Sequence, residues 1–225
     1  MPGTMQDMIE ATEVIPLFPT FVWKTTLKPE QAARINARIT GKLKQLTADL
    51  PELRPGGKWQ TDQTLHRLDE FQELNAVIHG AARGVAEFMK LVYTSFEITG
   101  CWANISAPGA RHKAHTHPNN FLSGVYYVRT PGSADTITFD DPRPQSNIIC
   151  PRNTEPGEEN AGQMFVRATE GMLILFPAWL PHSVGENKSG EFRVSVAFNL
   201  MFTEFAERMS QPKWEGNVSV KAETT

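Results

Sequence analysis

The first third of the chain changes from a strand-like pattern of apolar residues to a helical one. Residues 13–27, EVIPLFPTFVWKTTL, are rich in strand-forming residues but include two prolines, which favours an edge strand over a central one. Apolar residues then recur at helical spacing from Pro29, and a second stripe starts near Asp69. The stripes are Ile35, Ile39, Leu43, Leu46 and Leu50, then Phe71, Leu74, Ile78, Ala81, Val85, Phe88 and Val92. The pattern predicts an edge strand followed by two amphipathic helices.

After about residue 95, short apolar runs alternate with glycine, proline and asparagine. The runs are FEITGCWANIS, FLSGVYYVRT, DTITF, QMFVRAT, GMLILFP and EFRVSVAFNLMF. Many short strands at close spacing are typical of an antiparallel sandwich or a jelly-roll barrel. We therefore predict one mainly β domain over residues 1–225, with two N-terminal helices that each cover one sheet face. Its parts would be a supporting strand and helices at 13–95, a jelly-roll core at 96–202 and a C-terminal extension at 203–225.

Composition narrows the class of protein. The chain has 225 residues, of which 40% are hydrophobic and 21% charged, and its formal net charge is −3. Because it has no lysine or arginine block and no long apolar stretch, we expect neither a nucleic-acid partner nor a membrane span. The N-terminus lacks signal-peptide features, which predicts a cytoplasmic protein, with a homodimer as an open alternative to a monomer. Cys101 and Cys150 are too few for a disulfide scaffold, so we interpret both as small apolar residues.

Three of the six histidines fall within the first part of HKAHTHPNNFLSGVYYV, residues 112–128. In an extended chain His115 and His117 point to the same side, so they can share one metal ion at the start of the strand that follows. His112 lies in a stretch that resembles a loop and is a weaker candidate. A His-x-His pair on its own also fits a hydrophilic turn, so the metal hypothesis needs support from elsewhere in the chain.

That support comes from residues 171–199, GMLILFPAWLPHSVGENKSGEFRVSVAFN. His182 follows an apolar strand, and Arg193 opens the strand RVSVAFN. Strand alternation gives one face of this strand small and polar residues only, namely Arg193, Ser195, Ala197 and Asn199, which suits a pocket better than a core. A buried guanidinium needs an anionic partner, and a carboxylate ligand would supply it. The alternative is an arginine at a sheet edge that pairs with an acid such as Glu191.

Together these segments resemble a known family. The strings HTHP, LSGVYYV, the DP at 141–142, GMLILFPAWLPHSV and FRVSVAFN are similar to those of a bacterial and phage family of 2-oxoglutarate- and Fe(II)-dependent oxygenases, over residues 100–202. The resemblance implies a double-stranded β-helix, or jelly-roll, core that uses Fe(II), 2-oxoglutarate as cosubstrate and O2. It also implies that an unidentified substrate is hydroxylated while succinate and CO2 are released.

The family pattern implies roles for individual residues. The metal ligands would be His115, His117 and His182. Arg193, with Ser195, would bind the distal carboxylate of 2-oxoglutarate, and Tyr127 would donate a hydrogen bond to the same carboxylate. Asn104 would contact the cosubstrate or the substrate, although an asparagine that satisfies a turn is an equal alternative.

One position departs from the family pattern. The usual facial triad has two histidines and one carboxylate, whereas His117 here leaves the charge of iron without a protein counter-charge. Bound 2-oxoglutarate, a dianion, would offset that charge; Asp140 or Asp141 would do so only if it left a structural turn. Two other functions stay open: a three-histidine cupin-like dioxygenase that uses no 2-oxoglutarate, and a non-catalytic metal-binding jelly-roll module. Residues 106–114 and 142–163 are the expected lids over the site.

Overall fold

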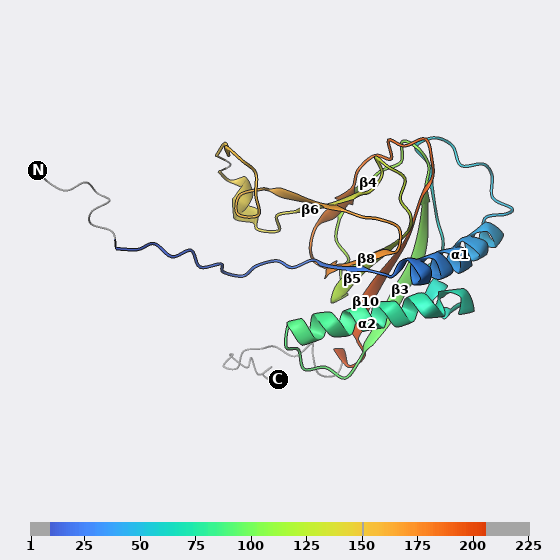
Figure 1. The fold of residues 1–225 in the computed structure, drawn as a ribbon, viewed down its shortest axis with the longest axis horizontal. Coiled ribbons are helices and arrows are strands. Elements are labelled where there is room, and N and C mark those ends of the chain that lie inside the picture. The colour runs from blue at the N-terminus through green and yellow to red at the C-terminus, as the bar shows by residue number, and fades with distance from the viewer. Residues whose placement is uncertain (1–9, 150, 206–225) are drawn as a thin grey trace, which may run out of the picture.

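The computed structural model describes residues 10–149 and 151–205, which fold mainly into two antiparallel sheets (Figure 1). The larger sheet has the strand order β1 (Trp23–Thr26), β8 (Met172–Pro177), β5 (Leu122–Arg129), β10 (Arg193–Phe202), β3 (Phe96–Ser106) and β2 (Lys58–Gln60). The smaller sheet has the order β4 (His112–His115), β9 (His182–Val184), β6 (Thr136–Asp140) and β7 (Gln163–Arg167). The predicted mainly β, jelly-roll class is confirmed.

An apolar cluster between the two sheets holds them together. It includes Ile137 and Phe139 from β6 and Ile174 and Phe176 from β8. The rings of Phe139 and Phe176 also flank His182, with centroid separations of 6.2 and 4.5 Å. The packing between the sheets therefore fixes the position of this histidine.

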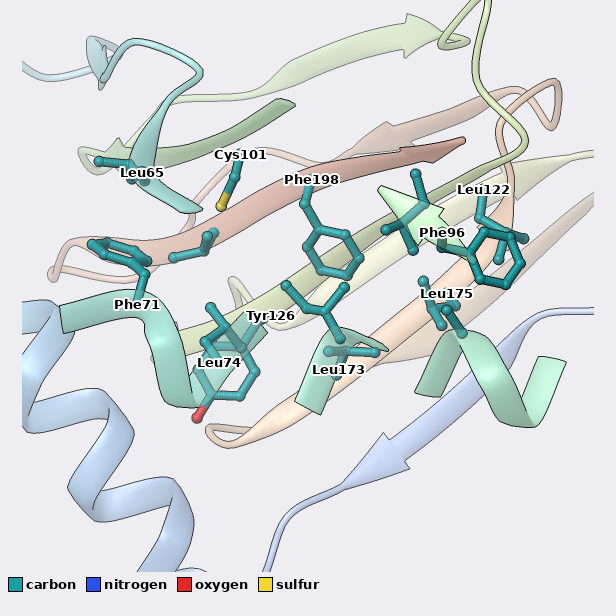
Figure 2. Packing of buried hydrophobic residues seen from close by; sticks show 14 of the residues in the cluster. Leu65, Phe71, Leu74, Phe96, Cys101, Leu122, Tyr126, Leu173, Leu175 and Phe198 are labelled. Carbon is teal, nitrogen blue, oxygen red and sulfur yellow. The ribbon is translucent and has the colours of Figure 1, made fainter. Parts of the chain in front are cut away.

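Both helices pack on the outer face of the six-stranded sheet (Figure 1). The helices α1 (Pro29–Leu46) and α2 (Gln72–Phe88) share one buried cluster with β3, β5, β8 and β10, part of which Figure 2 shows. Its members include Ile35, Ile39, Leu43, Leu74, Ile78, Val85, Cys101, Tyr126, Leu173, Leu175, Val196 and Phe198. The prediction that each helix covers a different sheet face is therefore wrong. The four-stranded sheet already covers the inner face, so only the outer face is left for the apolar helix stripes.

Both helices are shorter than their apolar stripes. Leu46 ends α1 and Leu50 lies beyond it, and both side chains are exposed. The helix α2 starts only after two short 3-10 turns, η2 (Leu65–Arg67) and η3 (Asp69–Phe71), and Val92 beyond its end is exposed. The apolar residues keep their helical spacing beyond the point where a neighbouring element covers them. Because packing stabilises a helix more than spacing does, each helix ends where that cover ends. A further short turn, η4 (Pro144–Asn147), lies in the stretch 142–163.

Specific contacts hold the outer face of β5. The hydroxyl of Tyr126 donates to Asn36 Oδ1 at 2.8 Å, and Asn36 Nδ2 donates to the carbonyl of Val128 at 3.1 Å. Gly124 lies under the ring of Phe198, where an added Cβ would be 2.4 Å from Phe198 Cζ. The glycine of LSGVYYV is therefore required by packing.

Other sequence predictions are tested only in part. The edge strand is confirmed for Trp23–Thr26, which pairs with β8 at the border of the sheet. Cys101 is a buried free cysteine as expected, whereas Cys150 and residues 206–225 of the predicted C-terminal extension lie outside the described residues. Within the described part of the chain, no helix has the length and apolar character needed to cross a membrane.

Candidate metal centre

The three predicted metal ligands lie together where β4 meets β9. His115 at the end of β4 and His182 at the start of β9 are direct cross-strand partners. His117 follows β4, and its backbone N–H donates to the carbonyl oxygen of Ala178 at 2.9 Å. One ring nitrogen of each histidine lies within 4.8 Å of those of the other two. The structure thus brings together the three residues that the family pattern marks.

Backbone carbonyls select the tautomers of two of these histidines. Nδ1 of His115 lies 2.8 Å from the carbonyl oxygen of Lys113, and Nδ1 of His182 lies 2.9 Å from that of Leu180. A carbonyl oxygen can only accept, so both Nδ1 atoms carry the proton and both Nε2 atoms keep a free lone pair. Nε2 of His182 faces Nε2 of His117 at 3.3 Å. The donor atoms are therefore oriented toward a common point by the protein alone.

Burial keeps the histidines ready to bind a metal. It lowers the pKa of His117 to about 4, with the neighbouring His115 and His112 adding to the shift. Burial also lowers the pKa of His182 to about 4, although the hydrogen bond to the Leu180 carbonyl opposes the shift. A metal ion must compete with protons for these nitrogens, and a low pKa removes that competition near neutral pH. Neutral imidazoles suit iron(II), so the donor set fits the metal that the resemblance implies.

The inner face of the six-stranded sheet forms a wall of the pocket beside the histidines. Ser195 on β10 is paired with Asn104 on β3 and with Tyr127 on β5, and all three line this pocket. The faces predicted for RVSVAFN are confirmed. Arg193 and Ser195 line the pocket, whereas Phe198 belongs to the outer core.

Arg193 is a buried cation without a protein counter-charge. Its side chain is 6% exposed, and within the described residues it forms no ion pair and no hydrogen bond. Burial lowers its pKa, and the nearby Tyr127 opposes that shift. Glu191, the alternative partner named above, pairs instead with Arg129 at the surface. The guanidinium therefore needs an anion that the described residues do not supply.

Two further polar atoms in this pocket lack partners. The Nε1 of Trp102 and the Oδ1 of Asn104 are buried and have no hydrogen bond within the described residues. Both residues line the pocket, and the ring of Trp102 lies 6.0 Å from that of His117. Unpaired buried polar atoms are costly, so their presence beside the histidines indicates a place for a polar ligand. The alternative that Asn104 satisfies a turn is not supported, because it lies within β3.

No carboxylate replaces the missing one in the described site. Asp140 accepts a hydrogen bond from Gln163, and Asp141 pairs with Arg143 in the turn after β6. Among the described residues, the group that could hold a metal contains only the three histidines. The structural turn role is therefore confirmed for Asp141.

Sequence reasoning placed His112 in a loop, and this is wrong. His112 begins β4 and pairs with Val184 of β9, and its ring stacks on His115 at a centroid distance of 4.6 Å. A register shift between His112 and His115 turns both side chains into the pocket, although strict alternation would separate them. Burial, followed by the charge of Lys58, lowers the pKa of His112 to about 4.

Asn187 is a second residue that sequence reasoning missed. It is buried, and its Nδ2 donates to the carbonyls of Ser106 and Glu191. Its Oδ1 accepts hydrogen bonds from Ser189, and its backbone bonds to Gly109 and Ala110. Asn187 thus fixes the loop before Arg193 to the end of β3. An asparagine in a polar loop gives no sequence signal of such a role.

Comparison with known proteins agrees with this geometry. Residues 100–199 match the family model described as "Putative 2OG-Fe(II) oxygenase". A search of curated proteins gave no match.

Solved structures share the fold at low identity. The prolyl-4-hydroxylase of Pseudomonas putida is 15% identical, with a TM-score of 0.55 over 81% of this chain and 93% of that one. The α-ketoglutarate-dependent epimerase SnoN from nogalamycin biosynthesis is 16% identical, with a TM-score of 0.58 over 81% and 79%. The carbocyclase SnoK from the same biosynthesis is 13% identical, with a TM-score of 0.59 over 88% and 90%.

The family match covers the strands that carry the three histidines and the arginine pocket. Enzymes of this family use Fe(II), 2-oxoglutarate and O2, and the histidine group and the unpaired buried arginine suit the first two of these. We conclude that residues 100–199, which hold the histidine group and Arg193, match the family of 2-oxoglutarate- and Fe(II)-dependent oxygenases.

Proposed function

We propose that His115, His117 and His182 hold Fe(II) and that Arg193 binds the distal carboxylate of 2-oxoglutarate. The observation that carries the proposal is the buried, unpaired guanidinium of Arg193 in the same pocket as the histidine group. A planar guanidinium matches the two oxygens of a carboxylate, which gives both charge and orientation. The enzyme would hydroxylate a substrate that remains to be identified.

Neighbouring side chains would complete the cosubstrate site. Tyr127 and Ser195 are direct cross-strand neighbours, and both have hydroxyl groups that can donate to the distal carboxylate. Burial raises the pKa of Tyr127 well above its usual value, so its hydroxyl keeps its proton and can donate. Asn104, paired with Ser195 on the other side, has a buried amide oxygen in need of a donor, which a substrate can supply, whereas its amide N–H groups can donate to the carboxylate of the cosubstrate. We assign it to contact with cosubstrate or substrate.

The charges of the site favour joint binding of metal and cosubstrate. When bound, iron(II), 2-oxoglutarate and O2 supply the oxidising chemistry, and the cosubstrate leaves as succinate and CO2. The protein holds the cosubstrate through Arg193 and orients the three imidazoles, and burial keeps those of His117 and His182 neutral near neutral pH. Because those imidazoles bring no negative charge, the 2-oxoglutarate dianion is the nearest counter-charge for the metal. We therefore expect 2-oxoglutarate to tighten metal binding.

We also propose that the chain works as one domain in the cytoplasm. Buried Cys101 is a free thiol, which fits a reducing compartment, as does the need for ferrous iron. A homodimer stays an alternative to a monomer, and sedimentation would decide between them.

Anaerobic titration of 2-oxoglutarate into the Fe(II)-loaded protein tests the proposed function. Chelation of iron by the keto acid should produce a visible charge-transfer band, and His182→Ala should abolish it. Iron that binds without a band would favour the three-histidine dioxygenase that needs no 2-oxoglutarate. Absence of iron binding would leave a jelly-roll module without this catalytic site.

A further inference from the structure

The pocket carries more positive charge than the cosubstrate needs. Lys58, Arg111 and Arg193 line it, and none of the described residues that line it is acidic. Within the described part of the chain, Lys58 and Arg111 form no ion pair. The chain as a whole has a formal net charge of −3. Positive charge is therefore concentrated in this pocket, where it can attract an anion selectively.

Lys58 and Arg193 lie in one row across the inner sheet face. Both pair with Ser106, from opposite sides, so about 10 Å separates their backbones, which is two strand spacings. Arg193 is buried, whereas Lys58 and Arg111 are exposed. The two exposed cations therefore lie at the mouth of the pocket, and the buried one lies inside it.

A contact between the two sheets marks this mouth. Nζ of Lys58 lies 3.3 Å from Nε2 of His112. Lys58 belongs to β2 and His112 to β4, each the terminal strand of its sheet. An ammonium group can only donate, so Nε2 of His112 accepts and its Nδ1 carries the proton. His112 thus holds the Lys58 ammonium group in place, and two further N–H groups of Lys58 remain free to donate to a ligand.

The charges at the mouth are left over once the cosubstrate is bound, so this step rests on the proposed function. Iron (2+) and Arg193 (1+) together exceed the 2− charge of 2-oxoglutarate, so the cosubstrate has no negative charge left over for other cations. Lys58 and Arg111 then have no counter-charge among the described residues. Cations that converge on a pocket favour a ligand with an oxyanion, because each N–H then forms a charge-assisted hydrogen bond.

We propose that the primary substrate carries an oxyanion, a carboxylate or a phosphate, that Lys58 and Arg111 bind at the mouth of the pocket. His112 orients the Lys58 side chain toward this group through their contact at 3.3 Å. The anion lies on the open side of the jelly roll and anchors the substrate, so that its remaining part extends toward the three histidines. These three residues thus select the substrate and position it without contact with the reacting atoms.

Small anions test this proposal without knowledge of the substrate. Acetate, inorganic phosphate and neutral acetamide are titrated into Zn(II)-loaded protein, with and without saturating 2-oxoglutarate, while NMR follows the side chains of His112 and Lys58. We expect saturable shifts with acetate or phosphate but not with acetamide, and no competition with 2-oxoglutarate. Binding to acetate alone indicates a carboxylate substrate, and binding to phosphate alone indicates a phosphate ester.

Matched variants assign the binding to the mouth. Lys58→Gln and Arg111→Gln should each weaken anion binding roughly tenfold, as expected for loss of one charge-assisted hydrogen bond. Lys113→Gln is the control, because Lys113 in β4 is an exposed cation two residues from Arg111 but does not line the pocket. The affinity for 2-oxoglutarate should stay unchanged in all three variants.

Several results would overturn the proposal. They are absence of saturable binding in the millimolar range, binding of anions only in competition with 2-oxoglutarate, and an equal loss in Lys113→Gln. Tight binding of a short single-stranded oligonucleotide that depends on Lys113 as much as on Lys58 would assign a nucleic-acid surface instead. Failure of the proposed function would show separately as absence of 2-oxoglutarate binding to the wild-type protein, while the titration without cosubstrate still decides whether the mouth binds anions.

Discussion

Tyr126 and Tyr127 are neighbours on β5, but they face opposite sides of the six-stranded sheet. Tyr126 is fully buried in the outer core, and its hydroxyl donates to Asn36. Tyr127 is 4% exposed, yet its hydroxyl has no hydrogen bond within the described residues, and it lines the pocket with Arg193. In this pair the hydroxyl on the outer face is bound within the protein, whereas the hydroxyl on the inner face is left available for a ligand.

The unpaired groups of the inner face are confined to the pocket. Away from the histidines, the hydroxyl of Ser123 donates to Asn199 Oδ1 at 2.8 Å, and both side chains are buried. Nearer the histidines, Asn104 Oδ1 and Trp102 Nε1 have no partner among the described residues. The fold is therefore able to pair polar groups on this face. The polar atoms that stay unpaired lie where we propose that the cosubstrate binds. Substitutions on the outer face should lower the free energy of unfolding, whereas substitutions on the inner face should weaken ligand binding.

The largest effect on stability should come from the centre of the outer face. Phe198→Ala removes a fully buried ring and should lower the free energy of unfolding by about 3–5 kcal/mol. Urea denaturation of the metal-free protein measures the change. Ser195→Ala, on the inner face of the same strand, is the control and should change this free energy by less than about 1 kcal/mol. Equal losses in the two variants would remove the distinction between the faces.

A methyl group added under the same ring should also destabilise the protein. In Gly124→Ala the new Cβ would meet both Phe198 and the carbonyl of Ile174, so we expect a loss of about 1–3 kcal/mol. Gly84→Ala in α2 is the matched control, because nothing lies within 4 Å of its added Cβ. It should be neutral or slightly stabilising. A Gly124→Ala variant as stable as the control would show that the outer face is not tightly packed.

The tyrosine pair provides the most direct contrast. Tyr126→Phe loses its hydrogen bond to Asn36 and should lower the free energy of unfolding by about 1 kcal/mol, with the affinity for 2-oxoglutarate unchanged. Tyr127→Phe should leave stability unchanged and weaken 2-oxoglutarate binding by up to about tenfold. Denaturation and anaerobic titration measure the two quantities. An exchange of these effects between the tyrosines would contradict the assignment of the faces.

Stability of the metal-free protein should also depend on pH. His117 and His182 have a pKa of about 4 in the folded protein, against an ordinary value of 6.5, because burial disfavours the charged ring. Between these values the unfolded chain binds more protons than the folded one, so stability should fall as the pH drops from 6.5 toward 4. Water in the open pocket moderates the effect.

Substitution of both rings checks this pH dependence. A His117→Gln/His182→Gln double variant should unfold with a shallower dependence on pH over the same interval. An unchanged slope would show that other groups cause the acid sensitivity.

The sequence predicted the parts of the site that depend on local pattern. The two-residue period of RVSVAFN correctly placed Arg193 and Ser195 opposite Phe198. The resemblance named the three histidines that the structure brings together. The prediction of the faces succeeded because alternation is a property of the chain itself, whereas the set of three histidines came from the family resemblance.

The parts that failed depend on the arrangement of elements in space. An apolar helix stripe does not show which sheet face it will cover, so both helices were not expected on one side. The register shift within β4 has no sequence signal, so His112 was assigned to a loop. Lys58 reaches the pocket from a three-residue strand more than fifty positions before His112, which no local pattern reveals.

The central claim is that Arg193 binds the distal carboxylate of 2-oxoglutarate and takes no part in holding the metal. Its most direct test is the dissociation constant of 2-oxoglutarate, together with the iron content measured without 2-oxoglutarate, in Arg193→Ala and in a control. The control is Arg129→Ala, whose arginine pairs with Glu191 at the surface. We predict that Arg193→Ala weakens 2-oxoglutarate binding roughly hundredfold with iron content nearly unchanged, and that the control binds like the wild type. Unchanged 2-oxoglutarate affinity in Arg193→Ala, or an equal loss of iron, would contradict the claim.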